Sequence, residues 1–258
     1  MITVTSAQLD YWLAALFWPL ARVLAVLAAA PVLGPTRIPV RVRIGLAVGI
    51  VIVLVPTLPA PPPVSPGSAA GLLILATQVV IGLAIGFALR LVFTAVEMAG
   101  DLIGMQMGLG FAMFYDPGNV QHTPILGQFM GLLATLTFLA INGHLMVISA
   151  LADSFRALPI DAQPLGSNLF DALSRHGAIV FIAGLQLALP LIITMLVVNL
   201  ALGVLTRAAP QLNIFAVGFP LTLAIGFGAL ILTLPYFGPV FERTLDQAFV
   251  FVTGLRAR

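Results

Sequence analysis

The two carboxylates Glu97 and Asp101 are the side chains of this sequence whose type and spacing best suit chemistry. They are four residues apart and therefore share one face of a helix, and Arg90, seven residues before Glu97, falls on roughly the same stripe. Ionisable groups in an apolar segment are costly and usually face water or a partner. The pair could therefore relay protons or contact a charged partner.

Apart from these carboxylates, the sequence has few residues that could form a catalytic or metal-binding site. The chain has no cysteine, which excludes a thiolate nucleophile, a disulfide and a cysteine metal site. It contains neither H-E-x-x-H nor G-x-S-x-G, and His122, His144 and His176 do not have the spacing of metal ligands. The sequence predicts no enzyme, no cofactor and no metal.

Three further polar residues lie in apolar stretches, namely Arg22, Asn142 and His144. An unpaired arginine at the centre of a membrane helix costs about 2.5 to 3.5 kcal/mol on insertion scales. We therefore expect Arg22 to pair with a carboxylate or with carbonyl groups. Asn142 and His144 are expected to form hydrogen bonds between helices, with a proton relay as the alternative. With Glu97 and Asp101 they make up a predicted set of contacts between helices or with partners.

The composition identifies the surroundings in which these residues lie. Of the 258 residues, 60% are hydrophobic and only 8% are charged, whereas globular proteins carry about 25% charged residues. Most of the surface must therefore contact membrane lipid or other apolar protein. The formal net charge of +2 is too small to indicate a nucleic-acid partner.

Apolar windows of about 18 residues or more can cross the hydrocarbon layer of a bilayer. The proline-rich run 56–63 divides one long window into two, and prolines at 235 and 239 predict a break before an amphipathic tail, 240–258. The sequence predicts an all-α, polytopic integral membrane protein, a single membrane domain over 1–258 with roughly six hydrophobic helical segments and broken helices. The windows are 11–33, 44–89 with its division, 123–152, 177–206 and 208–241.

Glycines recur at a spacing of four residues and place small residues on one helix face. Helices in lipid associate by close backbone approach across such faces. Packing within the chain and packing against neighbouring subunits both remain open. The repeats are Gly45/Gly49, Gly82/Gly86, Gly100/Gly104/Gly108 and Gly127/Gly131.

The segment 94–123 is too polar and too rich in glycine for a plain lipid-facing span. Its glycines and an Asp-Pro-Gly turn bracket a group of bulky side chains, which predicts a loop. Irregular backbone at membrane depth is tolerated where it is buried in protein or lines an aqueous cavity. The bulky residues are either an interfacial belt or core, or an element that closes a passage. The predicted loop residues are Gly108, Gly110, Phe111, Met113, Phe114 and Tyr115.

Several runs make the chain resemble the FliR/SctT family of type III export-gate subunits, and the similarity covers nearly the whole chain. The runs include Gly110-Phe111 through Asp116-Pro117, Phe138-Leu139-Ala140-Ile141-Asn142-Gly143-His144, Trp18-Pro19-Leu20-Ala21-Arg22 and Ala209-Pro210-Gln211-Leu212-Asn213. None of them is a catalytic signature.

The resemblance implies a multi-pass subunit of the flagellar export gate, in the bacterial inner membrane within the basal body. It implies FliP-like, FliQ-like and FlhB-like partners and exported unfolded proteins. It also implies a FliP-like part at about 1–176, a FliQ-like hairpin at about 177–258, and a pore plug at 108–119, with Phe111 and Phe114 as steric stoppers. Alternatives are the equivalent injectisome subunit and a proton-coupled secondary transporter or channel.

Overall fold

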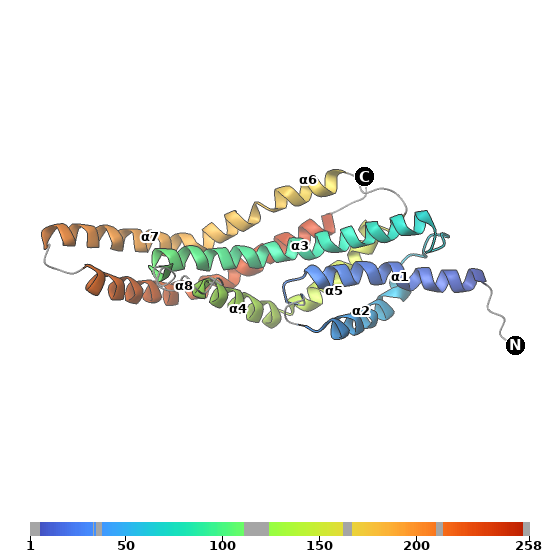
Figure 1. The fold of residues 1–258 in the computed structure, drawn as a ribbon, viewed down its shortest axis with the longest axis horizontal. Coiled ribbons are helices and arrows are strands. Elements are labelled where there is room, and N and C mark those ends of the chain that lie inside the picture. Colours follow the sequence, from blue (N-terminus) through green and yellow to red (C-terminus); the bar gives the residue numbers. More distant parts are fainter. Residues whose placement is uncertain are drawn as a thin grey trace, which may run out of the picture. The chain divides into compact units, whose positions relative to one another are not determined.

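The chain forms long α-helices in a computed structural model that describes residues 6–32, 34, 38–110, 124–161, 167–209 and 214–254 (Figure 1). Within these ranges there is no β-strand, which confirms the predicted all-α class. The helices are α1 (Ser6–Ala29), α2 (Val40–Leu54), a 3₁₀ turn (Val55–Thr57), α3 (Ala69–Gln106), α4 (Ile125–Ala140), α5 (Gly143–Ala157), α6 (Ser167–His176), α7 (Ile179–Ala208) and α8 (Ile214–Gly254).

The helices have the length and the apolar character of membrane spans. Five segments of the described chain are long and apolar enough to cross a bilayer, and a sixth is counted if α4 and α5 together form one broken span. This confirms the prediction of a polytopic protein with roughly six hydrophobic segments.

The chain divides into two compact units. The first contains residues up to Leu91, residues Leu139–Gly177 and residues from Asp246 onward. In this unit α1 packs against α2, and the two helices are seen beside each other in Figure 1. Trp18 of α1 is fully buried with Ala14 and Ile74. Its indole Nε1 donates a hydrogen bond of 3.3 Å to the carbonyl of Gly71, which joins α1 to the start of α3.

Two glycines of α3 allow close contact with α1 in the first unit. A Cβ added at Gly82 would lie 2.6 Å from Cβ of Ala25, and one at Gly86 would lie 2.6 Å from Cβ of Ala29. Contacts this short do not occur between real side chains, so both positions require glycine. This predicted glycine repeat therefore packs inside the chain.

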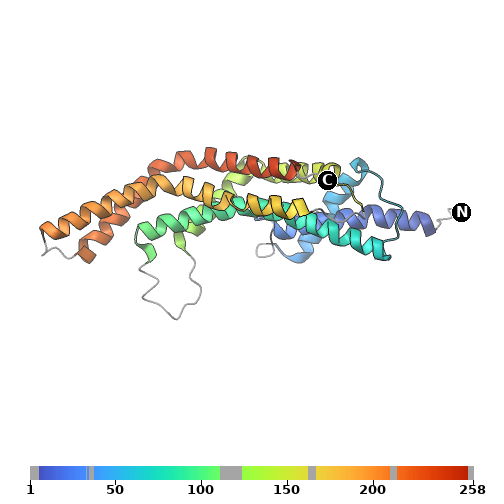
Figure 2. The same ribbon diagram turned by 90° about the horizontal axis from the view of Figure 1, so that it is seen from above.

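The second unit contains Val92–Phe138 and Ala178–Leu245. The helices α7 and α8 lie side by side in both views (Figure 1 and Figure 2). Phe93 of α3 makes edge-to-face contacts with Phe138 of α4, at 5.7 Å between ring centroids, and with Phe241 of α8, at 5.5 Å. Such aromatic pairs stabilise a core beyond their buried area, and here they link three helices.

One expected interruption is absent, so that prediction was wrong. The helix α8 continues through Pro235 and Pro239, where a break was predicted. By contrast, α3 extends to Gln106 and keeps Glu97 and Asp101 on one helix, as predicted. A proline removes one backbone hydrogen bond and bends a helix. Unwinding the helix in apolar surroundings would leave several more backbone groups unpaired, so the continuous helix is favoured.

A break that the hydropathy pattern of window 123–152 did not indicate lies between α4 and α5. Asn142 has φ 58° and ψ 32°, and it is the only non-glycine residue with positive φ in the described part of the chain. Asparagine tolerates this left-handed conformation better than most residues. It therefore ends one helix and allows the next to begin at Gly143. The division into a FliP-like part and a FliQ-like hairpin stays a prediction.

Candidate functional site

The predicted pore loop begins where α3 ends, in the second unit. Gly108 has φ 83°, and its N–H donates a hydrogen bond of 3.1 Å to the carbonyl of Met105. Glycine is the residue that adopts this left-handed conformation without strain just past a helix end. Gly110 is also described, whereas Phe111, Met113, Phe114 and Tyr115 lie outside the described residues.

The residue before this turn is held against α8. Met107 is fully buried, and its carbonyl accepts a hydrogen bond of 3.4 Å from the hydroxyl of Thr222. A Cβ added at Gly226 would lie 2.6 Å from Cγ of Met107. The missing side chain at position 226 thus makes room for Met107, and α8 fixes the backbone from which the predicted loop departs.

The two carboxylates of α3 lie over the glycines of α4, forming a contact that we call the α3–α4 seam (Glu97, Gly100, Asp101, Gly127 and Gly131). A Cβ added at Gly131 would lie 3.1 Å from Cγ and from Oε1 of Glu97, and one at Gly127 would overlap Oδ1 of Asp101. A Cβ at Gly100 would lie 2.7 Å from Cα of Gly127. The seam therefore needs glycine on both helices.

The carboxylates of the seam differ in exposure. Glu97 is exposed and Asp101 is half-buried. Among the residues that the structure describes, Asp101 forms no ion pair with a basic side chain. The seam thus has two acidic groups, one helical turn apart, on α3, and two glycines on α4.

The first unit holds the other predicted polar residues. Arg22 is fully buried and donates hydrogen bonds to Gln78 of α3 and to the backbone of Ser154 and Leu158 at the end of α5. Asn142 is exposed, and its left-handed backbone forms the turn between α4 and α5. His144 is half-buried, and its Nδ1 has no hydrogen-bond partner among the described residues. Partner contacts of these residues stay predictions.

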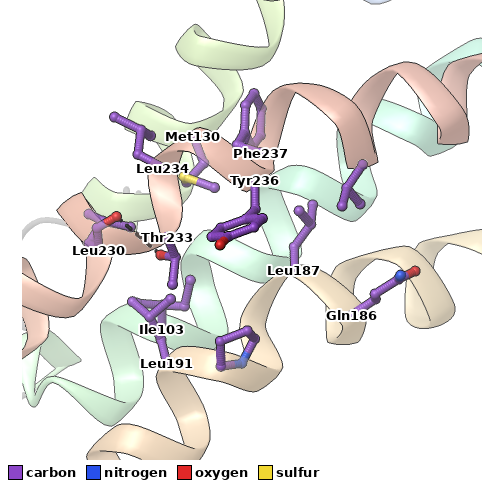
Figure 3. Close-up of a pocket in the computed structure, with 12 residues that line it drawn as sticks. Ile103, Met130, Gln186, Leu187, Leu191, Leu230, Thr233, Leu234, Tyr236 and Phe237 are labelled. Carbon is purple, nitrogen blue, oxygen red and sulfur yellow. Dashed lines mark hydrogen bonds between the residues drawn. The ribbon is translucent and has the colours of Figure 1, made fainter.

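A cavity of about 290 Å³ lies in the second unit between α3, α4, α7 and α8 (Figure 3). Aliphatic and aromatic side chains supply most of its lining, including Ile103, Met130 and Leu191. The hydroxyl of Thr233 bonds to the carbonyls of its own helix, at 3.0 and 3.1 Å. Among the described residues that line the cavity there is no carboxylate, histidine or cationic side chain.

The described residues contain no group of three His, Cys, Asp or Glu side chains that could hold a metal ion.

Sequence reasoning missed Gln78 as the α3 partner of Arg22, and Thr222 and Gly226 as the residues that hold Met107. Gln78 offered one signal, because it is a polar side chain in an otherwise apolar window. Thr222 and Gly226 are ordinary residues of an apolar helix and offered none.

Long apolar helices with glycine contacts define the class as a multi-pass helical membrane protein. Residues 13–248 match the family described as bacterial export proteins, family 1, and the chain belongs to this family. It is 47% identical over 249 residues to the flagellar biosynthetic protein FliR of Escherichia coli K12, covering 96% of this chain and 95% of that protein.

Other relatives carry the same name. The FliR protein of Pectobacterium carotovorum is 46% identical over 249 residues, with 96% of this chain and 95% of that protein covered. FliR of Bacillus subtilis is 32% identical over 160 residues, with 61% and 62% covered. These comparisons confirm the resemblance to the FliR/SctT family and support an export-apparatus subunit.

Proposed function

We propose that this chain is a subunit of the flagellar protein-export gate, a multi-pass protein of the bacterial inner membrane within the basal body. Its proposed partners are FliP-like, FliQ-like and FlhB-like subunits, and unfolded flagellar proteins are the proposed cargo. The observation that carries this proposal is the 47% identity to a flagellar biosynthetic protein over 96% of the chain. In this proposed role the chain helps to form and to close the pore through which unfolded proteins pass, and this requires no bond chemistry.

The lengths of two helices support partner subunits. At 1.5 Å per residue, the 41 residues of α8 extend over roughly 60 Å, and the 38 residues of α3 over roughly 57 Å. The hydrocarbon layer of a bilayer is only about 30 Å thick, and a tilt of about 40° is the upper end of the usual range. Lipid alone cannot cover the full length of these largely apolar helices, so other protein should cover part of the remainder.

The open glycines of α2 support the same conclusion. A Cβ added at Gly45 or at Gly49 would meet nothing within 4 Å, whereas the equally spaced Gly82 and Gly86 are filled by α1. Large apolar side chains on α2, such as Val53 at 73% exposure, are also uncovered. This face has the small residues that a neighbouring helix needs for close approach.

Closure of the pore is the proposed role of the loop that begins at Gly108 and includes Phe111, Met113, Phe114 and Tyr115. Apolar side chains in a narrow passage exclude water and ions and can yield to an unfolded chain. The anchored Met107 and the glycine turn support this role, because a plug needs a fixed base and a defined direction.

A deletion strain of the source bacterium tests the proposed function. Loss of the gene should abolish swimming and export of flagellar proteins into the medium, while plasmid-borne wild-type protein restores both. Membrane integrity and growth rate serve as controls for general damage. Normal export without the gene would overturn the proposal.

A further inference from the structure

The guanidinium of Arg22 is enclosed by groups from two other helices of the first unit. Nε donates a hydrogen bond of 2.8 Å to Oε1 of Gln78. Nη1 donates to the carbonyl and the hydroxyl of Ser154, at 2.9 and 3.2 Å. Nη2 donates to the carbonyl of Leu158 at 2.7 Å. All three nitrogen atoms of the guanidinium are therefore hydrogen-bonded.

The remaining contact of this group is with an aromatic ring. The guanidinium carbon lies 4.1 Å from the ring centroid of Phe155, within the range of a cation–π interaction. In the described chain Arg22 forms no ion pair with a carboxylate. A buried charge without hydrogen bonds or counter-charge would be strongly destabilising, so the cost of burying this charge must be offset by its polar contacts, which are carbonyl oxygens, an amide oxygen, a hydroxyl and the face of an aromatic ring.

The carbonyls that bind Arg22 belong to the end of α5. The helix ends at Ala157, and Leu158 has φ −129° and ψ 81° before Pro159. The last carbonyl groups of a helix lack partners within the helix and carry the negative end of its dipole. The carbonyl of Ser154 already accepts the N–H of Leu158 at 2.9 Å, so Arg22 adds a second hydrogen bond there. Arg22 also bonds the carbonyl of Leu158, which lies past the end of α5. A lysine ammonium lacks the planar fork that reaches three acceptors in different directions.

We propose that Gln78, Phe155 and the end of α5 form an internal guanidinium-binding site, which the side chain of Arg22 occupies. Occupancy of this site fixes the C-terminal end of α5 and the turn at Pro159 against α1 and α3. This role does not depend on the export function, because it concerns contacts within one chain.

Chemical rescue tests the site in isolated membranes, where the full-length tagged chain keeps whatever partners it has. We expect Arg22→Ala to lower the midpoint of heat-induced aggregation by about 5 °C or more. Millimolar ethylguanidinium should restore at least half of this loss. Ethylurea, which has a similar shape without the charge, and ethylammonium, which lacks the planar fork, should not restore it.

The exposed Arg90 provides the matched control, because Arg90→Ala should leave the midpoint unchanged and insensitive to ethylguanidinium. Equal rescue by ethylurea, or no rescue by any of the three compounds, would overturn the proposed site. An unchanged midpoint in Arg22→Ala would do the same.

A second measurement applies if Arg22→Ala does not accumulate in the membrane. Ser154→Ala should lower the midpoint in the wild-type background and have a much smaller effect in the Arg22→Met background, because the two residues share one interaction. Fully additive shifts of the two substitutions would contradict the proposal.

Discussion

Asp101 on α3 lies so close to Gly127 on α4 that a side chain at position 127 would overlap its carboxylate oxygen Oδ1. The neighbouring pair, Glu97 and Gly131, repeats this relationship one helical turn away. A Cβ added at Gly131 would lie 3.1 Å from Oε1 of Glu97. The α3–α4 seam thus joins a charged face to a glycine face. In the chain, α3 and α4 are the helices on either side of segment 111–123.

Gly127→Ala should force the two helices apart or displace Asp101. Overpacking of this kind typically costs about 1 to 3 kcal/mol. We expect a lower heat-aggregation midpoint of the chain in isolated membranes. Gly228→Ala in α8 is the control, because a Cβ there meets nothing within 4 Å and alanine favours a helix over glycine. Equal midpoints for the two variants would show that the seam is not close-packed.

The left-handed backbone at Asn142 predicts a specific order among substitutions. Asn142→Gly should retain stability, because glycine adopts positive φ without strain. Asn142→Val should cost about 1 to 2 kcal/mol, since a Cβ in this conformation crowds the carbonyl and branching adds to the clash. The same heat-aggregation assay measures both variants. A valine variant as stable as the glycine variant would argue against the turn.

Shortening the loop from Gly110 to Tyr115 should raise ion leakage while some export continues. The physical reason is that fewer apolar side chains remain to exclude water from the passage. A purified gate reconstituted in planar bilayers gives the conductance, and wild-type protein purified in the same way is the control. Unchanged conductance would count against a plug in this segment.

Glu97→Gln separates the export gate from the proton-coupled transporter. A gate that works by packing should keep the same proton flux in the absence of cargo, because the carboxylate carries no proton across the membrane. A transporter that uses Glu97 as a relay should lose most of this flux. Vesicles loaded with a pH-sensitive dye measure the flux. A large loss in the glutamine variant would favour the transporter.

Sequence reasoning succeeded where a property depends on composition along one helix. The apolar windows predicted the helical class and roughly six spans, because the bilayer imposes a minimum apolar length. It failed at Pro235 to Pro239, where a rule for helix breaking drawn from water-exposed chains was applied. In apolar surroundings the cost of unpaired backbone groups outweighs these local signals.

The contacts of individual polar residues could not be predicted for a different reason. Arg22 bonds to Ser154 and Leu158, which are 132 and 136 residues away in sequence, so no local pattern connects them. The repeat at Gly82 and Gly86 and the repeat at Gly45 and Gly49 look alike in sequence. Only the fold distinguishes the pair filled by α1 from the pair that remains open.

The central claim is that this chain works as one subunit of an export gate, and co-purification tests it most directly. The tagged chain is expressed alone and together with the FliP-like and FliQ-like proteins of the same bacterium, then extracted in mild detergent and sized. We predict one defined complex in the second case and an aggregating, heterogeneous chain in the first. A chain that is stable and monodisperse alone and retains neither protein would contradict the account.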